Sequence, residues 1–219
     1  MRKSLIVVSA SAGLLLAACS SSSKAAQTLP PASAAGGSSA SAVAAQSSPS
    51  VNITAELLAV SDLPAGWSST SDSGSSGGAA SCAALNNRPW QALPERAEAD
   101  FQQSEIGPFI AEKLDAGPSA QVAQAWAAFA SATATCRSFS GQTSSGTAQY
   151  KLSSLSFPSY GDQTYAFAIT VTASGISASG DVVVVRKGGT LVQILALGIP
   201  DVPVSTVEQF TSAAVAKVK

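Results

Sequence analysis

The sequence predicts an α+β fold in which an antiparallel β-sheet is packed by a central helix and a C-terminal helix. Three observations favour this class. Apolar residues recur at helical spacing over residues 119–137, strand-like segments follow one another between residues 148 and 196, and a second helical pattern follows Pro203. We expect both helices to cover one face of the sheet, as in many α+β layer arrangements.

The N-terminal part of the predicted domain combines a short helix with a hairpin. Residues 54–60 are typical of a helix that begins at Thr54, because threonine is a favourable N-cap. Residues 101–106 and 109–114 read as short strands, and the intervening Gly107 and Pro108 are a turn signal. We therefore expect these two segments to pair as neighbouring strands.

The clearest helix covers residues 119–137, with Ser119 as a candidate cap. Side chains at steps of three and four residues form one apolar stripe that should face the core. The stripe consists of Val122, Trp126, Phe129, Thr133 and Cys136. Trp126 is therefore expected to be a core residue.

The C-terminal half predicts a meander of four strands and a closing helix. The four segments are apolar or alternate in polarity and are rich in β-branched residues: 148–157, 164–173, 181–186 and 191–196. Gly188 and Gly189, between the last two segments, favour a tight hairpin turn. The closing helix follows Pro203, with Ser205 as a candidate cap.

The first 18 residues have the build of a secretory signal. Arg2 and Lys3 supply positive charge, and the apolar residues 5–16 are fewer than the roughly 20 that a membrane-spanning helix needs. Residues 16–19 resemble the lipobox of bacterial lipoproteins. This resemblance implies cleavage before Cys19 and attachment of a diacylglycerol to its sulfur, and two acyl chains give a stable membrane anchor. An ordinary secreted protein with an incidental Cys19 is the alternative.

Residues 19–53 predict a disordered tether between this anchor and the domain. They are almost entirely Ser, Ala, Gly, Pro and Gln, and such a segment cannot bury enough apolar surface to offset the entropy of ordering. Residues 54–219 then form one domain that is large enough for a hydrophobic core.

The composition argues against several classes of function. The chain has no histidine, 11% charged residues and a formal net charge of −1. The lack of histidine removes Ser-His-Asp and Cys-His nucleophile pairs and His-ligated zinc. The near-neutral charge gives no basic footprint for nucleic acid. We therefore expect no enzyme activity, no cofactor, no metal site and no nucleic-acid partner.

The chain contains three cysteines. If Cys19 carries lipid, Cys82 and Cys136 remain as an even pair in an oxidising compartment, which favours a disulfide between them. Two free thiols are the alternative. A disulfide would join the last turn of the central helix to the loop that carries Cys82.

Few side chains are candidates for a ligand site. Trp90 lies in a loop near Cys82 and is the candidate ligand-binding residue, because loop aromatics can anchor a ligand; packing over the disulfide is the alternative. Residues 95–100 carry three carboxylates around one arginine, and we interpret them as a solvated face. Asp162 lies in a turn sequence, where turn chemistry explains an aspartate.

Several segments resemble one known group of proteins. They are residues 54–58, residues 62–67, the end of the central helix at 134–136, and residues 182–186 before a glycine turn. They are similar to exported sensor-like domains of actinobacterial lipoproteins, which are related to the extracellular domain of the PknH-type receptor kinase. The resemblance covers about residues 54–218. It implies an α+β domain with a cleft against the sheet, a disulfide tying the central helix and an unidentified ligand. Those kinase domains carry two disulfides, whereas this chain can form one.

These observations leave three hypotheses for a domain anchored through Cys19 on the outer face of the cell membrane. The first is binding or sensing of an unidentified envelope ligand, such as an apolar molecule, in a cleft between helix and sheet. The second is an interaction or scaffold module for another envelope protein, which a flat exposed apolar patch would favour. The third is a hydrolase that uses carboxylates, which clustered buried carboxylates would favour.

Overall fold

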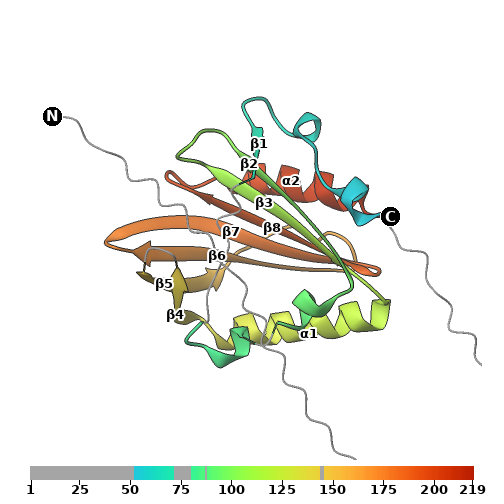
Figure 1. Ribbon diagram of the computed structural model, residues 1–219, viewed down its shortest axis with the longest axis horizontal. Coiled ribbons are helices and arrows are strands. Elements are labelled where there is room, and N and C mark those ends of the chain that lie inside the picture. Colours follow the sequence, from blue (N-terminus) through green and yellow to red (C-terminus); the bar gives the residue numbers. More distant parts are fainter. Residues whose placement is uncertain (1–51, 72–79, 87, 144–145) are drawn as a thin grey trace, which may run out of the picture. The chain divides into compact units, whose positions relative to one another are not determined.

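The computed structural model describes residues 52–71, 80–86, 88–143 and 146–219 of the protein. Within these residues, eight antiparallel strands form one sheet in the order β1-β2-β3-β8-β7-β6-β5-β4, and two α-helices pack against it (Figure 1). The predicted α+β class is confirmed. The predicted signal peptide (residues 1–18), Cys19 and nearly all of the tether (residues 19–53) lie outside the described residues.

The strands are β1 (Ser68–Thr70), β2 (Glu95–Gln102), β3 (Phe109–Ala116), β4 (Ser138–Thr143), β5 (Gly146–Ser154), β6 (Gln163–Ala173), β7 (Ile176–Lys187) and β8 (Thr190–Gly198). The short strand β1 pairs with β2, and β4 pairs with β5, so these two strands form the ends of the sheet. An isolated bridge between Ala80 and Gly141 extends the pairing beyond β4. No helix of the described residues is long and apolar enough to cross a membrane.

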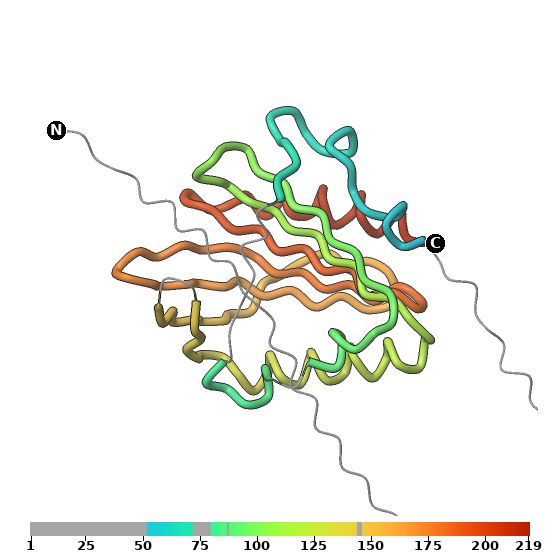
Figure 2. Tube along the Cα trace, in the orientation of Figure 1, coloured from blue at the N-terminus to red at the C-terminus, as the bar shows by residue number. Residues whose placement is uncertain are grey.

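The two helices cover opposite faces of the sheet, as Figures 1 and 2 show. α1 (Ser119–Thr135) packs on a cluster that contains Val184 of β7, whereas α2 (Val204–Lys217) packs on a cluster that contains the alternate residues Val183 and Val185. The expectation that both helices share one face is therefore wrong. The reason is that β7 and β8 are apolar on both faces, so each face needs a cover.

The central helix matches its prediction closely. α1 is rich in alanine, the residue with the highest helix propensity, and it ends at Thr135, two residues before the expected end. Every residue of the predicted stripe is buried: Val122, Trp126, Phe129, Thr133 and Cys136. Trp126 is thus a core residue, as predicted.

The N-terminal segment is less regular than predicted. In place of one helix over residues 54–60 there are two 3₁₀ turns, η1 (Ile53–Glu56) and η2 (Val60–Asp62); Thr54 does not cap the first, and at the second Asp62 Oδ2 accepts the Ala59 N–H at 2.7 Å. The helical prediction is wrong because the backbone N–H of Leu58 donates to the Glu112 side chain on β3 at 2.7 Å. That amide is therefore unavailable for a helical ladder.

The predicted hairpin around Gly107 and Pro108 is confirmed, but it is longer than expected. β2 begins at Glu95, six residues before the predicted start at residue 101, in a charged stretch where only the small side chains of Ala97 and Ala99 continue the apolar alternation of Phe101. Strand β4 had no sequence signal at all, because its residues are mostly polar or glycine. Both strands owe their place to pairing with neighbours in the sheet.

The C-terminal half follows the prediction. Each of the four expected strands overlaps one of β5 to β8, and Gly188 occupies the β7–β8 turn with φ of 56°, a backbone conformation that favours glycine. α2 starts directly after Pro203, so Ser205 lies inside the first turn and does not cap it.

Candidate ligand-binding cleft

A cleft lies between α1 and the face of the sheet that α1 covers. It encloses a cavity of about 300 Å³, which is at the lower end of the range for small-molecule sites. Its apolar wall comes from the helix, the sheet and the segment before β2, and it includes Trp90, Phe129, Phe139, Leu152, Phe167 and Ile169. The domain therefore has an open cavity beneath its central helix.

Phe129 of α1 lies at the centre of the aromatic wall. Its ring meets Trp90 edge-on at a centroid distance of 5.3 Å and Tyr165 edge-on at 6.2 Å. Phe167 of β6 lies at 6.2 Å in a tilted arrangement. Edge-to-face aromatic pairs are favourable beyond their buried area, so these contacts hold the helix at a defined distance from the sheet.

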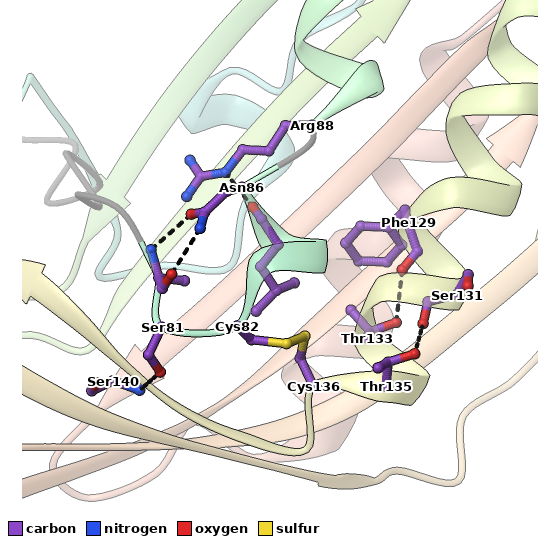
Figure 3. The surroundings of a disulfide bond; sticks show 12 residues. Ser81, Cys82, Asn86, Arg88, Phe129, Ser131, Thr133, Thr135, Cys136 and Ser140 are labelled. Carbon is purple, nitrogen blue, oxygen red and sulfur yellow. Dashed lines mark hydrogen bonds between the residues drawn. A yellow bond between two sulfur atoms is a disulfide. The ribbon is translucent and has the colours of Figure 1, made fainter.

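The disulfide between Cys82 and Cys136 fixes one side of the cleft (Figure 3). It joins the C-terminal end of α1 to the segment that contains η3 (Ala83–Leu85), with Cα atoms 6.0 Å apart. The predicted pairing is confirmed. The same segment is tied to β4, because the Ser81 N–H donates to the Ser140 carbonyl at 2.7 Å and the Ser140 N–H donates to the Ser81 hydroxyl at 2.9 Å.

A second hollow of about 250 Å³ adjoins the cavity and shares Arg88, Trp90 and Phe139 with it. Phe139 of β4 stacks on Tyr150 of β5, with ring centroids 4.9 Å apart and planes 8° apart. We refer to the two adjoining hollows as the α1 cleft. The cleft runs from beneath the helix to the β4 side of the sheet.

The charged groups that line the α1 cleft within the described residues are all cations: Arg88, Arg96 and Lys113. Two of them have carboxylate partners. Arg96 Nε binds Asp115 Oδ1 at 2.7 Å, and Lys113 Nζ binds Glu98 Oε1 at 2.9 Å. Two of the three positive charges are therefore already compensated.

Arg88 differs from the other two cations. Its Nε donates to the Leu85 carbonyl at 2.9 Å, and no described carboxylate forms an ion pair with it. It comes directly before η4 (Pro89–Ala92), the turn that carries Trp90. Because it lines both hollows, Arg88 places one uncompensated charge at their junction.

Asp115 holds Arg96 in place. Its side chain is almost fully buried, and burial raises its pKa above the ordinary value. The Arg96 guanidinium and the Gln193 amide, which donates at 2.6 Å, act in the opposite direction. This carboxylate therefore has a structural role beside the cleft, with its acceptor oxygens taken by two donors.

Glu112 lies on the same strand but faces the α2 side of the sheet. It is fully buried, its Oε2 accepts the Leu58 N–H, and its Oε1 has no hydrogen-bond partner among the described residues. Burial raises the pKa of Glu112 to about 7. Because residues three apart on a strand face opposite sides, Glu112 and Asp115 do not form a carboxylate pair.

The acidic residues predicted as a solvated face lie on β2. Glu98 is paired with Lys113. The pKa of Asp100 is raised, mainly by burial and to a smaller extent by the negative charge of Glu98. Both residues border a broader hollow of about 510 Å³ beside β1. Exposed residues such as Ser69 and Val60 form much of that hollow, so we regard the aromatic-walled α1 cleft as the better ligand site.

Trp90, the candidate ligand-binding residue, is buried in the wall of the α1 cleft instead of standing exposed on a loop. Sequence reasoning missed Arg88 and Phe139, although Arg88 is only two residues from Trp90 in the chain. The Asp162 side chain makes tertiary contacts beyond its own turn: it accepts the Gly188 N–H at 2.8 Å in the β7–β8 turn and pairs with Arg186 at 3.4 Å. No group of three or more potential metal-ligating side chains occurs in the described residues.

No protein-family model matches the chain, and no curated protein matches it. A similar solved structure is the crystal structure of the extracellular domain of PknH from Mycobacterium tuberculosis, with a TM-score of 0.51 and 12% sequence identity. The match covers 74% of this chain and 92% of that domain. The two domains share a fold, which agrees with the fold that the sequence resemblance implied.

Proposed function

We propose that this chain is an exported, membrane-anchored protein whose domain binds or senses a ligand in the α1 cleft. The observation that carries the proposal is the cavity of about 300 Å³ with aromatic walls, under a helix that a disulfide fixes. Preformed apolar concavities with a few polar groups are the usual form of small-molecule sites. The fold shared with an extracellular domain supports the same class of function.

Two further features support export. A disulfide such as Cys82–Cys136 persists in oxidising compartments outside the cytoplasm. The signal-like residues 1–18 and the lipobox that ends at Cys19 supply the route and the anchor. In this proposal the domain works on the outer face of the cell membrane, where its ligand is a component of the envelope.

The proposal is for binding without catalysis. Two carboxylates whose pKa is raised by burial, Glu112 and Asp115, are close in the chain but lie on opposite faces of the sheet. Asp181 also has a raised pKa, first through burial and then through the charge of Asp201. None of these groups lines the α1 cleft, so carboxylate-pair hydrolysis has little support there.

Native mass spectrometry of the full chain, extracted from the envelope in mild detergent, tests the proposal. We expect a bound-ligand mass shift for the native protein. Ala111→Phe should remove it, because Ala111 lines the cavity floor on β3. Ala178→Phe, a half-buried position on β7 outside the lining of either hollow, is the matched control and should keep the shift. An unshifted native protein, or a shift that survives Ala111→Phe, would contradict the proposal.

An interaction module is the second candidate function, because three exposed isoleucines lie toward the same end of the sheet. Ile106, Ile176 and Ile199 are 85%, 67% and 60% exposed. Antiparallel pairing brings their three connections to the same end. Exposed apolar groups of this kind mark partner surfaces. Replacing all three by serine should abolish a crosslinked envelope partner while leaving the ligand mass shift intact; an unchanged crosslinking pattern argues against this function.

A further inference from the structure

We infer that the ligand of the α1 cleft is an anionic amphiphile with one acyl chain, whose carboxylate or phosphate head binds Arg88. This inference rests on the proposed ligand-binding function and deepens it. Its basis is the separation of the cleft into an apolar part beneath α1 and a junction that carries one uncompensated cation.

The apolar part matches an acyl chain. Phe129 and Phe167, which contact each other, form one continuous apolar wall with Leu152 and Ile169. The cavity that this wall lines has none of the carboxylates of the described residues in its lining. Each methylene withdrawn from water strengthens binding by about fourfold, so a long chain gains affinity from every carbon that enters.

The charge of the cleft selects the sign of the head group. Among the described residues the lining carries three cations and no anion, and carboxylates compensate Arg96 and Lys113. Arg88 retains its charge in a half-buried position. An anionic head group would compensate it, whereas a cationic one would add to the repulsion.

The geometry of Arg88 places the head at the junction. Because Nε donates to the Leu85 carbonyl, the two terminal nitrogens of the guanidinium are left to face a ligand. A guanidinium binds a carboxylate or phosphate through parallel hydrogen bonds. The amides of Gln91 and Gln142 line the second hollow and add polar partners on the head side.

The test measures equilibrium binding of radiolabelled palmitate to the full chain in nanodiscs. Palmitate and monopalmitoyl lysophosphatidic acid should bind at least tenfold more tightly than monopalmitoylglycerol, which is neutral. Laurate should bind about 250-fold more weakly than palmitate, because it lacks four methylenes. The ratio between the carboxylate and phosphate probes then identifies which head group the site prefers.

Arg88→Met keeps an apolar side chain of similar length but removes the charge. It should erase the preference for the anionic probes and leave monopalmitoylglycerol binding within about threefold. Arg186→Met is the control, since Arg186 pairs with Asp162 outside the cleft and its loss should change nothing. An unaltered preference in Arg88→Met would overturn the inference, as would competition by acetate or inorganic phosphate alone as strong as that of palmitate.

The failures of the two proposals are distinguishable. If monopalmitoylglycerol binds as tightly as palmitate and Ala111→Phe removes both, the ligand-binding function stands and the anionic head group is wrong. If none of the amphiphiles binds and the native protein also carries no ligand, the ligand-binding function itself fails.

Discussion

The backbone N–H of Leu58 donates to Glu112 Oε2 at 2.7 Å, and this bond fastens the N-terminal segment to the middle of the sheet. The carboxyl group is fully buried, and burial raises its pKa to about 7. Two nearby charges act on it: Lys217 lowers the pKa and Asp62 raises it. Those two residues form an ion pair with each other at 2.6 Å. Burial is the largest influence on the pKa of Glu112.

Stability should therefore depend on the titration of Glu112. This group ionises near pH 4.5 in the unfolded chain and near 7 in the folded protein. Between these values the folded protein holds a proton that the unfolded chain has released. The contribution of Glu112 to the free energy of unfolding is therefore greatest below pH 4.5 and falls as the pH rises to 7. The fall corresponds to about 3 kcal/mol. Glu112→Gln keeps a hydrogen-bond acceptor for the Leu58 N–H and should abolish this fall in stability, because glutamine does not ionise.

Urea unfolding at pH 5 and pH 8 measures this effect. Glu112→Gln should be more stable than the native protein at pH 8 and close to it at pH 5. Glu98→Gln is the control, because Glu98 lies on the surface and its replacement should leave the difference between the two pH values nearly unchanged. Equal pH dependence in the native protein and Glu112→Gln would contradict the assignment.

The Arg96–Asp115 pair predicts a pH effect on the other face of the sheet. Arg96→Met leaves the buried Asp115 carboxylate with Gln193 as its remaining donor. The pKa of Asp115, already raised by burial, should rise further. The variant should lose about 1–3 kcal/mol of stability at pH 7 and less at pH 4, because protonation of the carboxyl group in the folded variant removes the uncompensated charge. A loss of the same size at both pH values would exclude this cause.

The parts of the fold that were predictable have strong local patterns. The apolar stripe of α1 buries its side chains along one periodic face, the β-branched runs of β7 and β8 bury theirs on both faces of the sheet, and the turn at Gly188 needs a positive φ. These elements are defined by residues close together in the chain. Their positions were therefore accessible from the sequence.

The parts that were missed depend on distant residues. The helix expected at residues 54–60 fails because Leu58 bonds to Glu112, 54 positions away. Likewise, the charge of Arg88 matters only because the disulfide segment places it beside Phe139 of β4. The continuous apolar run of β7 indicates that both faces of this strand are buried, but it does not indicate which helix covers which face.

The disulfide should make a large contribution to stability. It closes a loop with a sequence separation of 54 residues, for which loop-closure entropy gives roughly 4 kcal/mol. Replacing both Cys82 and Cys136 by alanine should lower the free energy of unfolding by about this amount and weaken ligand binding in the α1 cleft. Thermal unfolding and the ligand mass shift measure the two effects.

Alkylation provides an independent check on the pair. When the protein of unchanged sequence is denatured without reductant, iodoacetamide should label neither Cys82 nor Cys136. After reduction it should label both. Labelling of both residues before reduction would show two free thiols. If alkylation shows the bond but the double alanine variant keeps full stability, the disulfide does not stabilise the fold.

The proposed anchor predicts how the protein partitions. Cys19→Ala should prevent attachment of diacylglycerol, because the acceptor sulfur is absent, while the signal-like residues 1–18 remain. The native protein should enter the detergent phase of a Triton X-114 separation, since two acyl chains hold it there, and the variant should move to the aqueous phase. Ser20→Ala, one residue beyond the lipobox, is the matched control and should stay in the detergent phase. If Cys19→Ala still enters the detergent phase, membrane attachment depends on another part of the chain and the lipobox interpretation is wrong.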